Sequence, residues 1–468
     1  MFIPHTEADR EAMLRTIGVK HLEDLFVDIP SEFRYPELDL PPAASEMEVM
    51  AEMQEFAMAN ESTRDLICFL GAGAYNHYSP AVVDSIIRRG EFFTAYTPYQ
   101  PEISQGTLQA IFEYQSLIAG LTGMDVSNAS HYDGATAVAE AVNMAQAVFR
   151  GKRNKIVLSH ALHPQYRQTV RTYAQDSGLK IVGDESDPGS VQGMLNQSPE
   201  TLLALIDSQT ALVVVQYPDF FGRIFDYTDL AKVVHAAGAL LAVSVNPLAL
   251  GLLKPPGEFG ADIVTGEGQP LGIPLSFGGP YLGLFATRNE YVRKMAGRLI
   301  GETVDNRGQR AFVLTLTARE QHIRRDKATS NICTNQGLIA LASAVYLSAL
   351  GKQGLRHVAE LNYHKAHYAA QLIASLPDYQ LGYEAPFFNE FVVRCPQPAS
   401  IVNEILLDHG ILGGYDLGQD YPGLENYMLL AVTEMNTREE IDFLADILEE
   451  ASTDGDAGHH HSSEVDHA

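Results

Sequence analysis

Residues 107–290 alternate between helical patterns and short apolar runs, and this alternation limits the folds open to the chain. The expected helices span 107–121, 135–149, 165–176 and 227–237. The runs are rich in β-branched residues and span 155–158, 179–182, 211–215, 240–245, 262–264 and 280–285. Short apolar strands that alternate with helices are typical of a mostly parallel sheet covered on both faces. The sequence therefore predicts a large α/β domain.

The patterns on either side of this region divide the chain into further parts. We expect an N-terminal helical extension over 1–60, the large α/β domain over 61–300, a smaller α+β domain over 301–450, and a flexible acidic, histidine-containing tail over 451–468. A capped helix is expected after Thr6, and a second helix is expected to begin near Ser45. A loop-rich basic segment follows residue 300, and the small domain then shows patterns for a long helix at 335–350, strands at 391–394 and 427–432, and a closing helix at 437–450.

The charge balance excludes some classes of partner. Among 468 residues, 59 are acidic and 32 are basic, which gives a formal net charge of −27. Most of such a surface repels polyanions, so we expect no nucleic-acid partner. No apolar run reaches the roughly 18 residues of a membrane-spanning helix, and the first residues lack the basic start and apolar stretch of a signal peptide. We therefore expect a cytoplasmic protein with no membrane partner.

Cysteines and tail histidines predict neither a disulfide framework nor a metal centre. Cys68, Cys333 and Cys395 are widely spaced and form no Cys-x-x-Cys motif, which favours reduced thiols. The three histidines 459–461 lie in the acidic tail, where a solvated terminus is favoured over a weak metal site.

Phosphate-binding motifs are weak in this sequence. Neither Gly-x-Gly-x-x-Gly after a strand nor Gly-x-x-x-x-Gly-Lys-[Ser/Thr] is present, and the glycine-rich stretch 71–75 precedes the α/β alternation. The segment 131–136 opens a predicted helix, whose first N–H groups could bind an anion. The pattern favours the simpler interpretation that Asp133 caps that helix.

Two polar loops are the better candidate sites. The segment 93–106 gathers aromatic residues, prolines and polar side chains before a helix, and a loop of this composition is a more promising site than a core stripe. Residues 324–331 form a second polar cluster with Arg324, Arg325 and Lys327. The alternative for this cluster is a basic loop that balances an acidic surface.

Four stretches of the chain resemble the P-protein of the glycine cleavage system, the glycine decarboxylase that depends on pyridoxal phosphate (PLP). They are 96–106, 113–115, 121–124 and 324–334. The resemblance covers roughly residues 1–450 and matches the N-terminal half of the single-chain form, which is subunit 1, or α, in bacteria that split the protein. It implies a fold-type I PLP-transferase architecture, in agreement with the predicted α/β domain.

The resemblance also locates two replaced residues. PLP enzymes hold the cofactor as an imine on a lysine and usually pair its pyridinium nitrogen with an aspartate. At the matching positions this chain has Gln269 and Ser244. An amide cannot form the imine, and a hydroxyl cannot supply the negative charge. We therefore predict no catalytic residue, no metal and no PLP of its own in this chain, with the PLP bound by the partner, subunit 2 or β.

The family then implies a non-catalytic but required subunit of glycine dehydrogenase (decarboxylating), in an assembly of two copies of each subunit. The reaction decarboxylates glycine and passes the aminomethyl group to the lipoyl arm of the H-protein. The residues expected to reach the partner's site are Tyr96, Thr97, Tyr99, Gln100, Ser276, Phe277 and Gly278. Two alternatives stay open: an independent PLP-dependent lyase that uses Lys327 or Lys254, and a scaffold that only docks the H-protein.

Overall fold

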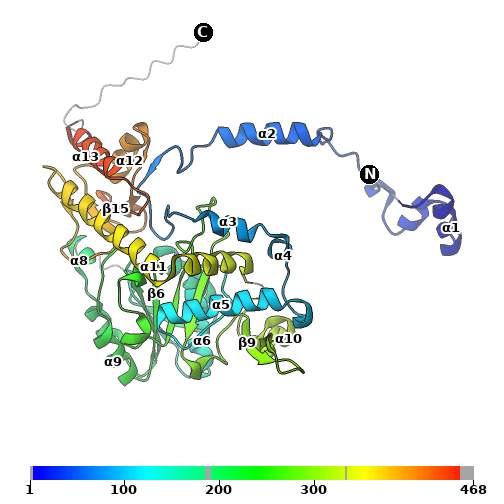
Figure 1. Ribbon diagram of the computed structural model, residues 1–468, viewed down its shortest axis with the longest axis horizontal. Coiled ribbons are helices and arrows are strands. Elements are labelled where there is room, and N and C mark those ends of the chain that lie inside the picture. The colour runs from blue at the N-terminus through cyan, green and yellow to red at the C-terminus, as the bar shows by residue number, and fades with distance from the viewer. Residues whose placement is uncertain (1–3, 185–190, 333–334, 454–468) are drawn as a thin grey trace, which may run out of the picture. The chain divides into compact units, whose positions relative to one another are not determined.

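The protein is described by a computed structural model that covers residues 4–184, 191–332 and 335–453. The chain divides into two compact units, Met1–Glu61 and Ser62–Ala468. The second unit contains a seven-stranded sheet with the strand order β2-β8-β7-β6-β5-β3-β4 (Figure 1). Its strands are β2 (Val126–Ser127), β3 (Lys155–Leu158), β4 (Lys180–Val182), β5 (Thr210–Tyr217), β6 (Leu240–Val245), β7 (Ile263–Glu267) and β8 (Gly283–Thr287).

Five neighbouring strands, β4, β3, β5, β6 and β7, are parallel, whereas β8 pairs antiparallel with both β7 and β2. This confirms the predicted mostly parallel sheet. Alternate residues of β5 enter different cores: Leu212 and Val214 pack with residues of α6 (Gly134–Phe149), and Val213 and Val215 pack with residues of α9 (Thr228–Ala236). Residues 211–215 of β5 are apolar without interruption because both faces of this strand are covered.

The other predicted helices of this region are α5 (Gln105–Thr122) and α7 (Pro164–Tyr173). Helix α5 packs against α11 (Gly337–Ala374), and Figure 1 shows the two running side by side. The carboxyl ends of β6 and β7 lead directly into the segments that carry the candidate residues, which is where open α/β sheets place their sites.

A second sheet, with the order β11-β12-β15-β14, lies in the C-terminal part. Strands β12 (Glu390–Arg394) and β15 (Tyr427–Ala431) and helix α13 (Arg438–Thr453) match the sequence predictions. The sequence analysis missed the two-residue strands β11 (Gln380–Leu381) and β14 (Tyr415–Asp416), as well as α12 (Ala399–Asp408). Strands of two residues carry too little alternation to be recognised. The predicted domain boundary at residue 300 stays a prediction.

Helix α11 is longer than predicted. Its first part ends where Gly351 takes a φ of 61°, and a second helical part follows to Ala374. The buried face of that second part includes the small residues Ala359, Ala366 and Ala370, which give a weak apolar signal. By length and composition alone α11 could cross a membrane. Its buried residues instead pack in the hydrophobic cores of the second unit, as those of a core helix do.

The segment after residue 300 was predicted to be loop-rich, and this was wrong. Strands β9 (Leu299–Val304) and β10 (Arg310–Thr315) form an antiparallel hairpin. Most of its side chains are exposed or half-buried, and Glu302 pairs with Arg310 across the strands at 2.8 Å. Because so few of its residues are buried, the hairpin lacks the apolar alternation from which a strand is predicted.

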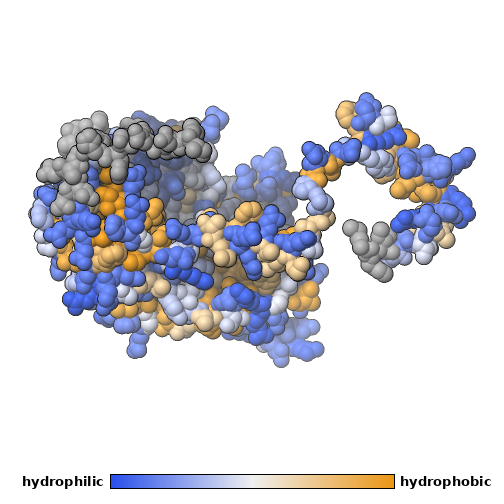
Figure 2. All heavy atoms as spheres, turned by 90° about the horizontal axis from the view of Figure 1, so that it is seen from above, coloured by the Kyte–Doolittle hydropathy of each residue, from blue (hydrophilic) through white to orange (hydrophobic). Residues whose placement is uncertain are grey.

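The N-terminal unit contains the two predicted helices, and both are capped, whereas a cap was predicted only for the first. Thr6 and Asp9 form a capping box at the start of α1 (Glu7–Ile17), and Ser45 and Glu48 do the same for α2 (Glu46–Met58). Neither helix has a buried residue. Figure 2 shows hydrophobic residues on the surface of this unit, and those of α2 that are exposed are Met47, Val49, Met50, Met53, Phe56 and Met58.

Candidate functional site

Gln269 lies directly after β7 and is fully buried. Its amide nitrogen donates to the carbonyl oxygens of Tyr75 (2.9 Å) and Ile273 (2.7 Å), and its amide oxygen accepts from the backbone N–H of Tyr75 (2.9 Å). Both ends of the side chain are therefore bonded within the chain. The amide holds the segment at Tyr75 against the turn after β7.

Glu267, two residues earlier, lies at the N-terminus of α6. Its Oε2 accepts from the backbone N–H of Gly134 (2.9 Å), and its Oε1 accepts from the N–H groups of Gln269 (3.0 Å) and Leu282 (2.9 Å). Burial raises the pKa of this carboxyl to about 7, although the three N–H donors favour the ionised form. The backbone N–H of Gly134 at the start of α6 therefore already has a hydrogen-bond acceptor within the chain.

Asp133 caps α6, as the sequence predicted: its carboxylate accepts from the N–H of Thr136 at 2.7 Å. The space above this helix start is also filled. A Cβ added at Gly134 would come within 2.3 Å of the hydroxyl of Tyr166, whose ring stacks on that of His163. An anion such as a phosphate group would have to displace both the Glu267 carboxylate and this ring.

Ser244 lies on β6, is 1% exposed, and pairs in register with Gln216 and Thr265. Neither neighbour is charged. The glycine-rich stretch 71–75 has a structural role nearby, because a Cβ at Gly71 would meet Ala431 at 2.4 Å. There Glu390 accepts from the hydroxyl of Tyr75 and from the N–H of Ala72, both at 2.7 Å.

No lysine of the described chain is placed to hold a cofactor as an imine at this position. Of the ten lysines, eight are exposed, including Lys254 and Lys327. The other two are bound elsewhere: Lys155 pairs with Asp207 at 2.9 Å, and Lys365 donates to the carbonyl oxygens of Glu434 and Asn436. The residues around Gln269 and Ser244 therefore do not fit PLP. The tail histidines 459–461 and Cys333 lie outside the described residues.

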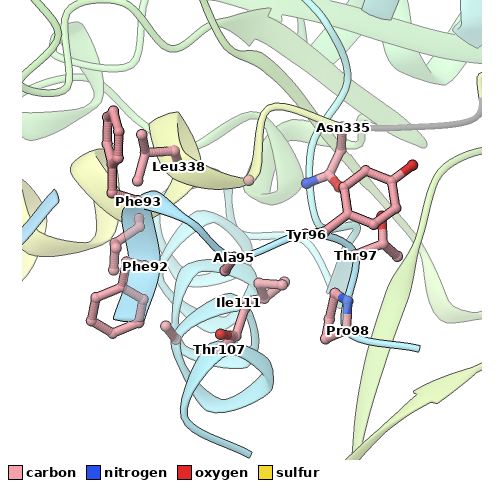
Figure 3. Close-up of a pocket in the computed structure, with 13 residues that line it drawn as sticks. Phe92, Phe93, Ala95, Tyr96, Thr97, Pro98, Thr107, Ile111, Asn335 and Leu338 are labelled. Atoms are coloured by element: carbon pink, nitrogen blue, oxygen red, sulfur yellow. The ribbon is translucent and has the colours of Figure 1, made fainter. Parts of the chain in front are cut away.

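The predicted loop 93–106 lines a cavity of about 140 Å³. Figure 3 shows Tyr96 and Thr97 at one end of it beside Asn335, with Phe93 at the other end. Tyr96 is 76% exposed. The hydroxyl of Thr97 is buried and has no hydrogen-bond partner among the described residues. The cavity thus combines aromatic rings with an unpaired hydroxyl.

Tyr99 and Gln100, the other two residues predicted in this loop, differ in their contacts. The Tyr99 hydroxyl accepts from the guanidinium of Arg298 at 3.3 Å, and its ring makes an edge contact with that of His322. Gln100 is exposed. The sequence analysis missed Arg298 and Asn335, which hydrogen-bond to each other at 3.2 Å behind this loop. Asn335 directly follows the stretch 324–334 that resembles the P-protein family, so that stretch carried a partial signal.

The second predicted group forms an exposed turn after Gln269. Phe277 has a φ of 52° and is 99% exposed, and Gly278 has a φ of 96°. Ser276 donates to the carbonyl oxygen of Pro274 at 3.3 Å. Within the part of the chain that the structure describes, no hydrogen bond or ring contact joins this turn to residues 96–100. That the two groups share one site therefore stays a prediction.

Comparisons with known proteins agree on one family. Residues 1–448 match the glycine cleavage system P-protein family. A protein named probable glycine dehydrogenase (decarboxylating) subunit 1 from Thermomicrobium roseum is 58% identical over 97% of this chain and 100% of its own length. The protein of the same name from Desulforamulus reducens is 54% identical over 95% of this chain and 98% of its own length.

Solved structures give the same result. The crystal structure of an inhibitor-bound glycine decarboxylase (P-protein) of the glycine cleavage system is similar with a TM-score of 0.87 and 43% identity, over 96% of this chain and 100% of that one. A sphingosine-1-phosphate lyase from Burkholderia pseudomallei shares the fold, with a TM-score of 0.66 at 14% identity over 91% of this chain and 94% of that one. The predicted fold-type I architecture is confirmed, and the chain belongs to the glycine cleavage system P-protein family.

Proposed function

We propose that this chain is subunit 1 of a two-subunit glycine decarboxylase and has no active site of its own. Its relatives over nearly the whole length carry the name subunit 1, which implies a subunit 2. In this proposal two copies of each subunit assemble in the cytoplasm. Glycine is the substrate, and the lipoyl group of the H-protein receives the aminomethyl group.

The observation that carries the proposal is the saturated hydrogen bonding of the buried Gln269. We infer that this residue stands where a catalytic subunit has its imine-forming lysine, and that Ser244 stands where that subunit has its aspartate. An amide with all its groups bonded is a stable part of a core rather than an empty reactive position. PLP therefore belongs to subunit 2.

PLP bound there would supply the electron sink for the loss of carbon dioxide. The residues of this chain form one wall of the shared site. Tyr96 and Tyr99 present rings that exclude water from it, and Thr97 and Gln100 present polar groups that orient the small substrate. A largely exposed tyrosine and a buried, unpaired hydroxyl are features that a partner surface would complete.

The turn at 276–278 is the second contact with subunit 2. A fully exposed phenylalanine on a residue with positive φ is unfavourable in water and in conformation, and burial in a partner compensates for both. Ser276 and Gly278 hold this turn in shape. Phe277 then packs against the partner rather than taking part in the chemistry.

Borohydride trapping tests the proposal. The chain alone, the second subunit alone and the two together are incubated with PLP, reduced and digested, and pyridoxyl-lysine is located by mass spectrometry. We expect the adduct only on the second subunit and exchange of carbon dioxide with glycine only in the mixture. A stoichiometric adduct on one lysine of this chain, such as Lys327 or Lys254, would overturn the proposal in favour of an independent PLP-dependent lyase.

A further inference from the structure

Positive charge is concentrated in one stretch of this acidic chain. Residues 288–327 contain ten of the 32 basic residues and five of the 59 acidic ones, a local net charge of +5. Since the whole chain carries −27, the remainder carries −32. The stretch corresponds to the β9–β10 hairpin, the segment before it and the polar cluster after it. Charge this strongly segregated creates a local attractive field on an otherwise repulsive surface.

Six cations of this stretch are exposed and have no acidic partner among the described residues. One, Arg307, lies between β9 and β10, and the other five form what we call the basic surface: Arg293, Lys294, Arg324, Arg325 and Lys327. Elsewhere in the described chain, Arg88, Lys232 and Arg356 pair with a neighbouring carboxylate, whereas other exposed cations, such as Lys152 and Lys180, have no such partner among the described residues. The basic surface is distinguished by its place in a stretch where basic residues outnumber acidic ones two to one.

A cavity of about 50 Å³ opens within the basic surface. Its lining includes Arg293, Lys294, Arg324 and the residues Thr329 and Ser330. It also includes one carboxylate, Glu320, whose charge is balanced by Arg298 at 3.7 Å. Arg319 forms the base and is bound internally, since it donates to the carbonyl oxygens of Leu316 and Gly297, both at 3.0 Å. Cationic and hydroxyl groups around a space of this size are suited to a single carboxylate.

The basic surface is continuous with the loop of the proposed shared site. Gln105, at the end of that loop, exchanges two hydrogen bonds with the backbone of Phe312 on β10, at 2.8 and 2.9 Å. Tyr99 contacts both Arg298 and His322. Figure 1 shows β9 and α10 (Gln321–Arg324) beside the N-terminal end of α5, where the loop joins that helix. A molecule on this surface therefore lies near the loop that carries Tyr96 and the cavity that this loop lines, which we take as the entrance to the proposed shared site.

We propose that the basic surface docks an acidic face of the lipoyl-bearing H-protein, with one of its carboxylates in the 50 Å³ cavity. This rests on the proposed function, because only that function calls for a carrier protein that must present its arm to the shared site. Charge attraction on an otherwise negative subunit directs the carrier to the one surface beside the entrance, and it speeds encounter without requiring a tight complex.

Charge reversal tests this docking. The variant carries Arg293→Glu, Lys294→Glu and Arg324→Glu. The matched control carries Arg150→Glu, Lys152→Glu and Lys180→Glu, which are exposed cations outside the stretch and change the charge equally. Both are assembled with subunit 2. The H-protein is titrated at low and at high salt, with direct binding and exchange of carbon dioxide with glycine as readouts, and free lipoamide serves as a small acceptor.

At low salt we expect the surface variant to raise both Kd and KM for the H-protein about tenfold or more, with kcat and the lipoamide reaction unchanged. We expect the control variant to keep the parental Kd and KM. Added salt should raise the parental Kd and KM toward those of the surface variant. Unchanged Kd and KM would overturn the docking proposal, as would an equal effect of the control or a failure of the surface variant to assemble with subunit 2. Charge-dependent binding without any turnover would leave the docking in place and refute the proposed function instead.

Discussion

The backbone N–H of Gly134 donates to Oε2 of Glu267 at 2.9 Å, so a carboxylate of the chain lies at the N-terminus of α6. A helix N-terminus carries unpaired N–H groups and a partial positive charge, and in many proteins it binds a phosphate. Here the acceptor comes from the strand next to it. The same carboxylate also accepts from the N–H groups of Gln269 and Leu282, which ties helix, strand end and turn into one unit.

Replacing Glu267 by glutamine tests this bridging role. The glutamine side chain keeps one acceptor oxygen, but its NH₂ group faces a backbone N–H. That N–H then has no hydrogen-bond acceptor. We expect Glu267→Gln to lower the free energy of unfolding by about 1–3 kcal/mol, the range for a buried donor left unsatisfied. Urea denaturation of the isolated chain measures it. The exposed Glu258→Gln serves as the control and should change little. A Glu267→Gln protein as stable as the parent would show that the carboxylate is dispensable there.

We expect that a lysine introduced at position 269 will not create a site for the cofactor. In Gln269→Lys, three hydrogen bonds are lost and an ammonium is buried among carbonyl groups, while Glu267 and Tyr166 still fill the helix start. We expect a loss of roughly 2–4 kcal/mol in unfolding free energy and no pyridoxyl adduct after borohydride reduction. The exposed Gln209→Lys is the matched control. An adduct at position 269 would mean that the single substitution suffices for cofactor binding.

The raised pKa values of three buried carboxyl groups predict one contribution to the pH dependence of the unfolding free energy. Burial raises the pKa of Glu140, Glu267 and Glu390 to about 7, from an ordinary value of 4.5. Between these two values the unfolded chain has released protons that the folded chain still holds, so the stability contributed by these three groups falls as pH rises from about 4.5 to about 7 and then levels off. The buried His131, His160 and His163 contribute in the opposite direction, because burial lowers their pKa values from 6.5 to about 3, about 4 and about 4, so their contribution rises with pH up to about 6.5. Each group contributes at most about 1.4 kcal/mol per pH unit.

Urea unfolding at pH 5, 6, 7 and 8 measures this slope. Glu390→Gln removes one carboxyl group and should shift the slope between pH 5 and pH 7 in the positive direction, whatever its effect on absolute stability. The exposed Glu404→Gln should leave the slope unchanged. A slope that is the same in Glu390→Gln as in the parent would mean that the hydrogen bonds to this carboxylate outweigh its burial.

The large domain was predictable because its strands are apolar on both faces, and the start of α6 was predictable from its cap, Asp133. On β5, Val213 and Val214 enter different cores, so the run is apolar without a gap. The β9–β10 hairpin was missed since only one edge of it reaches the core, as at Ile300 and Phe312. The second half of α11 was missed because alanines form much of its buried face.

The site was predictable to a lesser degree. Tyr96 and Thr97 were recognised from the composition of their loop, and they line a cavity together. The partners that fix this loop, Arg298 and Asn335, are distant in sequence, and no local pattern connects them to Tyr99. The role of Glu267 was also hidden, because a lone acidic residue at the end of a strand does not reveal which helix start it will contact.

A substitution of Tyr96 tests whether this chain shares the active site with subunit 2 or only docks the H-protein. Tyr96→Ala removes an exposed ring, so we expect the unfolding free energy of the chain to change by less than about 0.5 kcal/mol. If the ring closes the partner's site against water, exchange of carbon dioxide with glycine by the assembled enzyme should fall about tenfold or more, because removing one positioning contact costs at least this much. Ile103→Ala, in the same loop and 81% exposed, is the matched control and should keep the parental rate. If the H-protein instead binds more weakly while the exchange rate is unchanged, this chain docks the carrier and contributes nothing to the site.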